Sequence, residues 1–153
     1  MHPFVAGYFG KERRQFEEDL DGAAGVGFIG RCAPLFGVKG GVLYDVSPNW
    51  SIGPAVGVAF NLRDGEHTAV LAELEANYFT AGRAYIGTGI GVYDLFDGDD
   101  IAPTVLLNFG VPIAKGKTKG QLYVTGEGRL LLDELDNADS NYMFWGGLRY
   151  HFK

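Results

Sequence analysis

Six charged residues occupy positions at which an extended strand would turn them to a single side. They are Lys39, Glu73, Glu75, Glu127, Arg129 and Arg149. Side chains two residues apart lie on the same face of a strand, so the carboxyl groups of Glu73 and Glu75 would point together. Buried charges are tolerated only when they are paired and hydrogen-bonded. Three acids and three bases therefore predict a buried ion-pair network, which we favour over a proton or ion path through the three glutamates.

The histidines do not match a nucleophilic site. The chain contains His2, His67 and His151, and none of them has a serine two residues away. His67 follows Glu66 in a polar segment, where an exposed loop histidine is the ordinary interpretation. Cys32 has no evident catalytic partner and is expected to behave as a small apolar residue. The sequence predicts no catalytic residues.

Two acidic segments offer oxygen ligands for cations. They read FDGDD (Phe96–Asp100) and DELDNADS (Asp133–Ser140), and neither has the spacing of a calcium-binding loop. Charge runs are usually solvated, so we expect an acidic rim and no metal site. The run GTGIG lies within a strand pattern rather than before a helix, so it is not a phosphate loop. No cofactor is expected.

The elements that would position these residues are long alternating segments. Each contains twelve or thirteen residues: Phe36–Ser47, Trp50–Asn61, Thr68–Phe79, Arg83–Asp94, Ile101–Ile113, Gly120–Leu132 and Asn141–Phe152. Strands of soluble proteins average about 5 to 6 residues, whereas a transmembrane strand needs about 9 to 11. No run of about 18 apolar residues predicts a transmembrane helix.

The connections between these segments alternate in character. Ser47–Trp50, Thr80–Arg83 and Ala114–Gly120 contain no acidic residue, while Leu62–Thr68, Leu95–Asp100 and Asp133–Ser140 contain nine Asp or Glu and one Arg. Short turns at one end and longer polar loops at the other are typical of a membrane β-barrel.

The two faces of the segments also differ. Val56, Leu74 and Val124 represent a bulky apolar face, and the opposite face carries the charges among Gly and Ala. Aromatic residues gather near strand ends, as in interfacial girdles: Trp50, Phe60, Tyr78, Phe109, Tyr142, Phe144, Tyr150 and Phe152. We expect the apolar face to point outward to lipid. The alternative is a soluble β-sandwich or lipocalin-like barrel with an aromatic core.

The last strand carries a family signal. GLRYHF resembles the C-terminal signal of bacterial outer-membrane β-barrels, with Gly147, Leu148, Tyr150 and Phe152 at the matching positions and Lys153 as a departure. The chain resembles the small barrels of the outer-membrane protein A/X type. That resemblance implies a bacterial outer-membrane location and recognition of this strand by the barrel-assembly machinery.

The N-terminal third leaves the strand count open. We expect a first strand near Pro3–Arg13, with residues 14–35 in an outer segment, because barrels of this type have even strand numbers. A second strand extended from Ala23 onward, or a ten-stranded barrel, are the alternatives. The fold class is all-β: a single domain over residues 1–153, forming an eight-stranded antiparallel up-and-down transmembrane β-barrel.

The expected function is that of a non-enzymatic envelope or surface barrel, with acidic outer loops and a lumen plugged by ion pairs. Its partners would be outer-membrane lipid and lipopolysaccharide, with weak Ca²⁺ or Mg²⁺ bridges less favoured than a solvated rim. The net charge of −6 argues against nucleic acid. Alternatives are a narrow pore or carrier for a small or apolar compound, and a lipid A-modifying enzyme. A protease-like site of Asp97, Asp99, Asp100 and His67 is disfavoured without a larger barrel.

Overall fold

The fold is described from a computed structural model of the chain. The described residues are 1–16, 29–61, 68–96, 101–115, 120–132 and 142–152, and of residues 12–16, 29–33, 61, 114 and 115 only the backbone is described. Within these ranges there is no helix of the length and hydropathy needed to cross a membrane.

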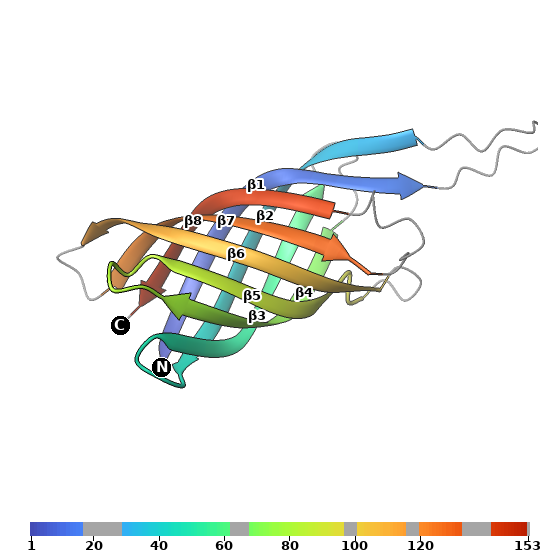
Figure 1. Cartoon of the computed structure of the whole chain (residues 1–153). Helices are drawn as coiled ribbons and strands as arrows, with labels where there is room; N and C mark the ends of the chain where they lie inside the picture. Colours follow the sequence, from blue (N-terminus) through green and yellow to red (C-terminus); the bar gives the residue numbers. More distant parts are fainter. Residues whose placement is uncertain (17–28, 62–67, 97–100, 116–119, 133–141, 153) are drawn as a thin grey trace, which may run out of the picture.

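The described residues form eight strands that close into a barrel, each hydrogen-bonded to its neighbours in the sequence and β1 to β8 (Figure 1). All pairs are antiparallel. The bounds are β1 His2–Phe16, β2 Ile29–Asp45, β3 Trp50–Asn61, β4 Thr68–Phe79, β5 Tyr85–Tyr93, β6 Ala102–Lys115, β7 Gly120–Leu131 and β8 Tyr142–Phe152. The predicted eight-stranded antiparallel barrel is confirmed.

The N-terminal strands differ from the preferred prediction. β1 continues to Phe16 and β2 begins at Ile29, and the two pair over their whole length, from His2 with Leu43 to Phe16 with Ile29. The assignment of residues 14–35 to an outer segment was therefore wrong at both ends of that range. The alternative, a second strand extended from Ala23 onward, agrees with the structure from Ile29, and residues 23–28 lie outside the described residues.

The direction of the side chains is as predicted. Val56 is 63% exposed and Leu74 is 46% exposed, whereas Glu73 and Arg129 are 6% and 3% exposed. Bulky apolar residues thus cover the outside of the barrel and the charged residues lie within it. A soluble barrel with its aromatic residues in a central core would show the reverse.

The two ends of the barrel are built differently. At the end where both chain termini lie (Figure 1), turns join β2 to β3 and β4 to β5. Val46 N–H donates to the Trp50 carbonyl at 2.9 Å, and Thr80 N–H donates to the Ala84 carbonyl at 2.8 Å. We call this end the turn end and the opposite one the loop end.

Two glycines face large aromatic side chains inside the barrel. A Cβ added at Gly37 would lie 2.6 Å from the ring of Trp145, and one added at Gly110 would lie 2.1 Å from the ring of Tyr85. Glycine at these two positions lets each aromatic side chain lie directly against the backbone. An eight-stranded interior has room for side chains and little else, so close contacts of this kind let it hold large ones.

An apolar cluster fills the lumen toward the loop end. Its members are Ala6, Tyr8, Leu35, Ala59, Ala69, Leu71, Tyr93, Ala102, Leu131, Met143 and Trp145. Leu35, Leu71 and Leu131 are each at most 2% exposed. Each lies on the loop side of a charged residue in its own strand, since Lys39, Glu73 and Arg129 follow toward the turn end. We call these eleven residues the loop-end layer.

Candidate functional site

All six charged residues singled out from the sequence lie inside the barrel and belong to one network of ion pairs. Lys39 comes from β2, Glu73 and Glu75 from β4, Glu127 and Arg129 from β7, and Arg149 from β8. Each of the six is at most 6% exposed. The inward direction of each side chain follows from strand alternation, which places residues two apart on the same face. We call these residues the lumenal network.

The ammonium group of Lys39 is the centre of the network. Its Nζ atom lies 2.5 Å from Glu73 Oε1, 2.7 Å from Glu75 Oε1 and 2.6 Å from Glu127 Oε2. A lysine ammonium has three protons to donate, and three carboxylates surround it here. One cation therefore joins acidic side chains from two different strands.

The two arginines complete the charge balance. Arg129 Nε donates to Glu127 Oε1 at 2.6 Å, and its Nη2 donates to Glu73 Oε2. Arg149 Nη2 donates to Glu75 Oε2 at 2.8 Å. Each glutamate is thus paired with two cations, and the six formal charges sum to zero. The pairing of charges that a low-dielectric interior requires is therefore complete, while Arg129 Nη1 and Arg149 Nε and Nη1 have no hydrogen-bond partner among the described residues.

The network connects opposite walls of the barrel. Three strands separate β4 from β8 in either direction around the closed sheet, so the Glu75–Arg149 pair spans the lumen. Aromatic rings also lie against the guanidinium groups of the two arginines. The Arg149 guanidinium carbon lies 3.6 Å from the centre of the Phe4 ring, and that of Arg129 lies 5.1 Å from the Trp145 ring. Such cation–π contacts are stronger when they are desolvated.

The three glutamates alone resemble a cation site. One ligand atom from each of Glu73, Glu75 and Glu127 lies within 4.8 Å of the others, and carboxylate oxygens are the ligands that hard divalent cations prefer. The Lys39 ammonium already stands among them at hydrogen-bonding distance. A metal ion would have to displace this side chain, because the three carboxylates are already paired with the Lys39 ammonium group.

The sequence analysis missed the aromatic and aliphatic residues that accompany the network. Met143 and Trp145 are 0% and 4% exposed and point inward. They share the parity of Arg149 along β8, just as Leu71 shares the parity of Glu73 along β4. Parity with an inward-facing charge could have identified them. The bulk of their side chains, which is typical of the lipid-facing side, concealed their position.

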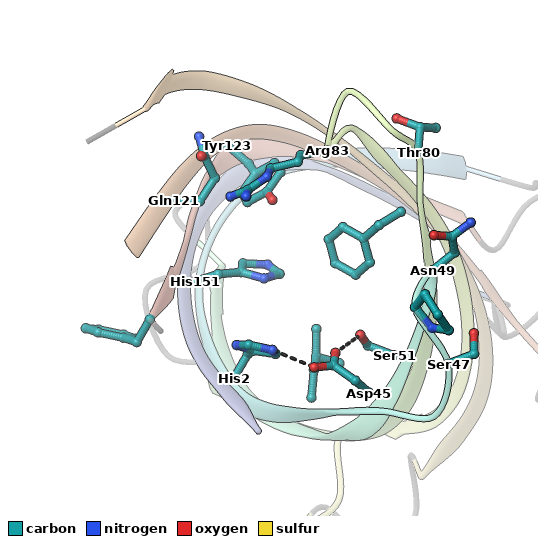
Figure 2. A pocket seen from close by; sticks show the side chains of 14 residues that line it. His2, Asp45, Ser47, Asn49, Ser51, Thr80, Arg83, Gln121, Tyr123 and His151 are labelled. Atoms are coloured by element: carbon teal, nitrogen blue, oxygen red, sulfur yellow. Dashed lines mark hydrogen bonds and ion pairs between the residues drawn. The ribbon is translucent and has the colours of Figure 1, made fainter. Parts of the chain in front are cut away.

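A second polar cluster lies at the turn end. The Asp45 carboxylate accepts a hydrogen bond from Ser51 Oγ at 2.6 Å, and the His2 ring nitrogen Nε2 lies 2.6 Å from its other oxygen (Figure 2). In a nucleophilic triad the histidine must contact the serine and take its proton. Here the acid stands between them, so His2 is not placed to activate Ser51.

The other residues named from the sequence fall in three groups. His67, Asp97, Asp99 and Asp100 lie outside the described residues, as do most of the acidic loop positions. His151 is 7% exposed and lies inside the barrel at the turn end. Of the assembly-signal residues, Leu148 and Phe152 point outward and are 51% and 45% exposed. Gly147 faces the backbone of Gly7 so closely that an added Cβ would lie 1.9 Å from its carbonyl oxygen.

Comparisons with known proteins identify the fold. No protein-family model matches the chain, and no curated protein sequence matches it. The crystal structure of neisserial surface protein A is 11% identical with a TM-score of 0.62, and the match covers 99% of this chain and 96% of that one. The N-terminal β-barrel domain of Pseudomonas aeruginosa OprF is 15% identical with a TM-score of 0.50, covering 98% and 97%.

The outer-membrane protein AlkL, solved in lipid bilayers, is 16% identical over all of this chain and 91% of its own, with a TM-score of 0.38. Neisserial surface protein A and the OprF domain are eight-stranded outer-membrane β-barrels, and the strands of this chain likewise close into one antiparallel barrel. The chain has the fold of the small eight-stranded outer-membrane β-barrels.

Proposed function

We propose that the chain is a small, non-enzymatic barrel of the bacterial outer membrane whose lumen is closed to ions. The single observation that carries this proposal is the lumenal network, which joins opposite walls through Lys39 and Arg149. An eight-stranded barrel has little interior space beyond what side chains fill. Ion pairs that cross it occupy the space that a path for water and ions would need, which supports a closed lumen.

The outer surface supports the membrane location. Ile86, Ile90 and Leu107 are 62%, 64% and 65% exposed on the outside of the barrel. Aromatic pairs lie near both strand ends: the Trp50 and Tyr78 rings are 5.3 Å apart at the turn end, and the Phe36 and Phe60 rings are 6.5 Å apart toward the loop end. Exposed apolar surface bounded by aromatic residues is the property of a lipid-facing barrel wall.

Two partners belong to the proposal. Outer-membrane lipid and lipopolysaccharide would contact the apolar wall, and the barrel-assembly machinery would recognise β8 through Gly147, Leu148, Tyr150 and Phe152. The last two residues support this, because their rings form an exterior pair with centres 4.8 Å apart at the turn end. Alanine at Tyr150 and Phe152 together should reduce the fraction of chain assembled in the outer membrane.

Membrane integration is tested first. The purified chain should require detergent to remain in solution, and its mobility in a denaturing gel should change on heating. Chain that stays monodisperse without detergent would exclude the membrane assignment. Mass spectrometry of lipid A from cells with and without the protein tests the non-enzymatic part, and a difference in acylation would contradict it.

Conductance tests the closed lumen. In planar lipid bilayers the native chain should give no stable openings. The double variant Lys39→Ser with Glu75→Ser removes one charge of each sign, so it keeps the network neutral while clearing space between the walls, and it should conduct. Leu74→Ala, on the outer face of the same strand, is the matched control and should remain silent. Stable openings of the native chain would favour the pore hypothesis.

A further inference from the structure

The turn end of the lumen is hollow. A cavity of about 390 Å³ opens there between the ends of the strands and the turns. Figure 2 shows polar side chains from several strands surrounding it. Its lining includes His2, Asp45, Phe79, Arg83, Tyr123 and His151. We call this cavity the turn-end pocket. Its volume lies in the range of small-molecule sites, about 300 to 1,000 Å³.

Arg83 supplies a cation to this pocket. Arg83 is exposed at the mouth of the pocket, and its side chain reaches from the turn toward Tyr123 (Figure 2). Its backbone has a φ of 63°, the left-handed region that favours glycine. A non-glycine residue there is sterically strained, because its Cβ lies too close to the backbone. A strained residue that carries a charge into a cavity is a reason to look for a ligand.

His151 supplies a second polar group. It is 7% exposed, and its Nε2 atom has no hydrogen-bond partner among the described residues. Its ring is held by aromatic neighbours, with centroid distances of 5.7 Å to Phe4 and 4.9 Å to Tyr123. Buried polar atoms normally have partners. Figure 2 shows the ring directed into the pocket, where a ligand could provide one.

The acid of the pocket already has partners. Asp45 is the acid in its described lining, and its carboxylate accepts a hydrogen bond from Ser51 and contacts the His2 ring. The guanidinium of Arg83 is the arginine cation of that lining, and its planar shape matches that of a carboxylate.

We propose that the turn-end pocket binds a small, ring-bearing carboxylate. The Arg83 guanidinium would pair with the carboxylate through two parallel hydrogen bonds. His151, in the tautomer that carries the proton on Nε2, would donate a third hydrogen bond. The rings of Phe79 and Tyr123 would contact the ring of the ligand, as aromatic residues do in small-molecule sites. This inference goes beyond the proposed function, and a closed lumen is compatible with a pocket that opens at one end only.

Ligand-observed ¹⁹F NMR on the full chain in micelles of an uncharged detergent tests the proposal. The probe is 4-fluorobenzoate, and 4-fluorobenzamide is its neutral counterpart. We expect saturable broadening for the benzoate and at least tenfold weaker binding of the benzamide. Arg83→Gly should weaken benzoate binding by about 10- to 100-fold, as expected for loss of a charge-assisted hydrogen bond. Glycine suits the backbone at this position, so the variant should fold.

Two further variants keep the test specific. Lys11→Ala removes an exposed cation from the β1 strand, far from the turns, and should leave binding unchanged. His151→Phe keeps a ring among the aromatic neighbours and should weaken binding severalfold, with heat-dependent gel mobility confirming that it is folded. Absence of saturable binding, equal binding of the two probes, or native affinity in Arg83→Gly would each overturn the proposal.

Discussion

The two ends of the lumen are filled by opposite means. Toward the loop end, Tyr8, Leu71 and Trp145 belong to an apolar layer whose members are at most 4% exposed. At the turn end, a cavity of about 390 Å³ is lined by polar side chains that include Arg83 and Asp45. The lumenal network lies between them. Among the described residues, the lumen is therefore packed with apolar side chains toward the loop end and hollow at the turn end.

The packed loop end and the hollow turn end contribute differently to the stability of the barrel and to binding. Apolar side chains packed in the loop-end layer contribute to the free energy of unfolding, as do paired charges that cannot be separated without loss. The turn-end pocket holds instead a strained backbone at Arg83 and an unpartnered nitrogen on His151. Features of that kind reduce stability and are typical of sites that bind something.

The largest expected effect comes from breaking the network between the two ends. Lys39→Met leaves three buried carboxylates with only two arginines, and removal of one partner from a buried ion pair costs about 3–5 kcal/mol. The free energy of unfolding, measured by urea titration in detergent with tryptophan fluorescence, should fall by that amount. The double variant Lys39→Met with Glu127→Gln restores neutrality and should recover part of the loss. Native stability in the single variant would show that the charges are solvated.

The loop-end layer is tested by a pair of leucines three positions apart on β4. Leu71 is 0% exposed inside the barrel and Leu74 is 46% exposed outside it. Leu71→Ala should lower the free energy of unfolding by about 2–5 kcal/mol because it leaves a cavity. Leu74→Ala should cost distinctly less in the same urea titration. Equal losses for the two variants would mean that the layer is not packed as a core.

A smaller effect is expected at Gly37, where the Trp145 ring of the loop-end layer lies against the backbone of β2. Gly37→Ala places a Cβ 2.6 Å from the Trp145 ring, which must then shift. Overpacking of this kind costs about 1–3 kcal/mol, and the altered Trp145 environment should change the near-ultraviolet circular dichroism spectrum. Gly7→Ala is the control, since a Cβ added there meets nothing within 4 Å. An unchanged spectrum in Gly37→Ala would argue against the ring contact.

The smallest effect, and one of opposite sign, is expected at the turn end. Arg83→Gly should raise the free energy of unfolding by about 1 kcal/mol, because glycine adopts a positive φ without a steric penalty. Arg83→Ala also removes the guanidinium but retains a Cβ, so it should not gain this stability. Urea titration of both variants separates the backbone from the side chain. A loss of stability in Arg83→Gly would assign the guanidinium a structural role.

Much of this architecture could be predicted from alternation alone. Strand parity predicted the inward direction of Glu73, Glu127 and Arg149, and the count of seven long segments together with the even strand number of such barrels predicted eight strands. Parity does not give the register, that is, which residues of neighbouring strands lie opposite each other. The convergence of three carboxylates on Lys39 could therefore be seen only from the register of the structure. The pocket was not predictable either. Its lining combines the ends of several strands with two turns, and the sequence TAGR does not reveal that Arg83 has a positive φ, because glycine precedes it.

The distribution of the lumenal network over the chain has a consequence for the order of assembly. Glu75 lies on β4, while Arg149, one of its two cations, lies on the last strand. The carboxylate can exchange water for that guanidinium only when β8 has docked and β1 has closed the ring. Until then Glu75 has Lys39 as its cation partner and lacks the second one. The full pairing of this carboxylate arrives with the final strand, so an incomplete cylinder is less suited to a lipid interior.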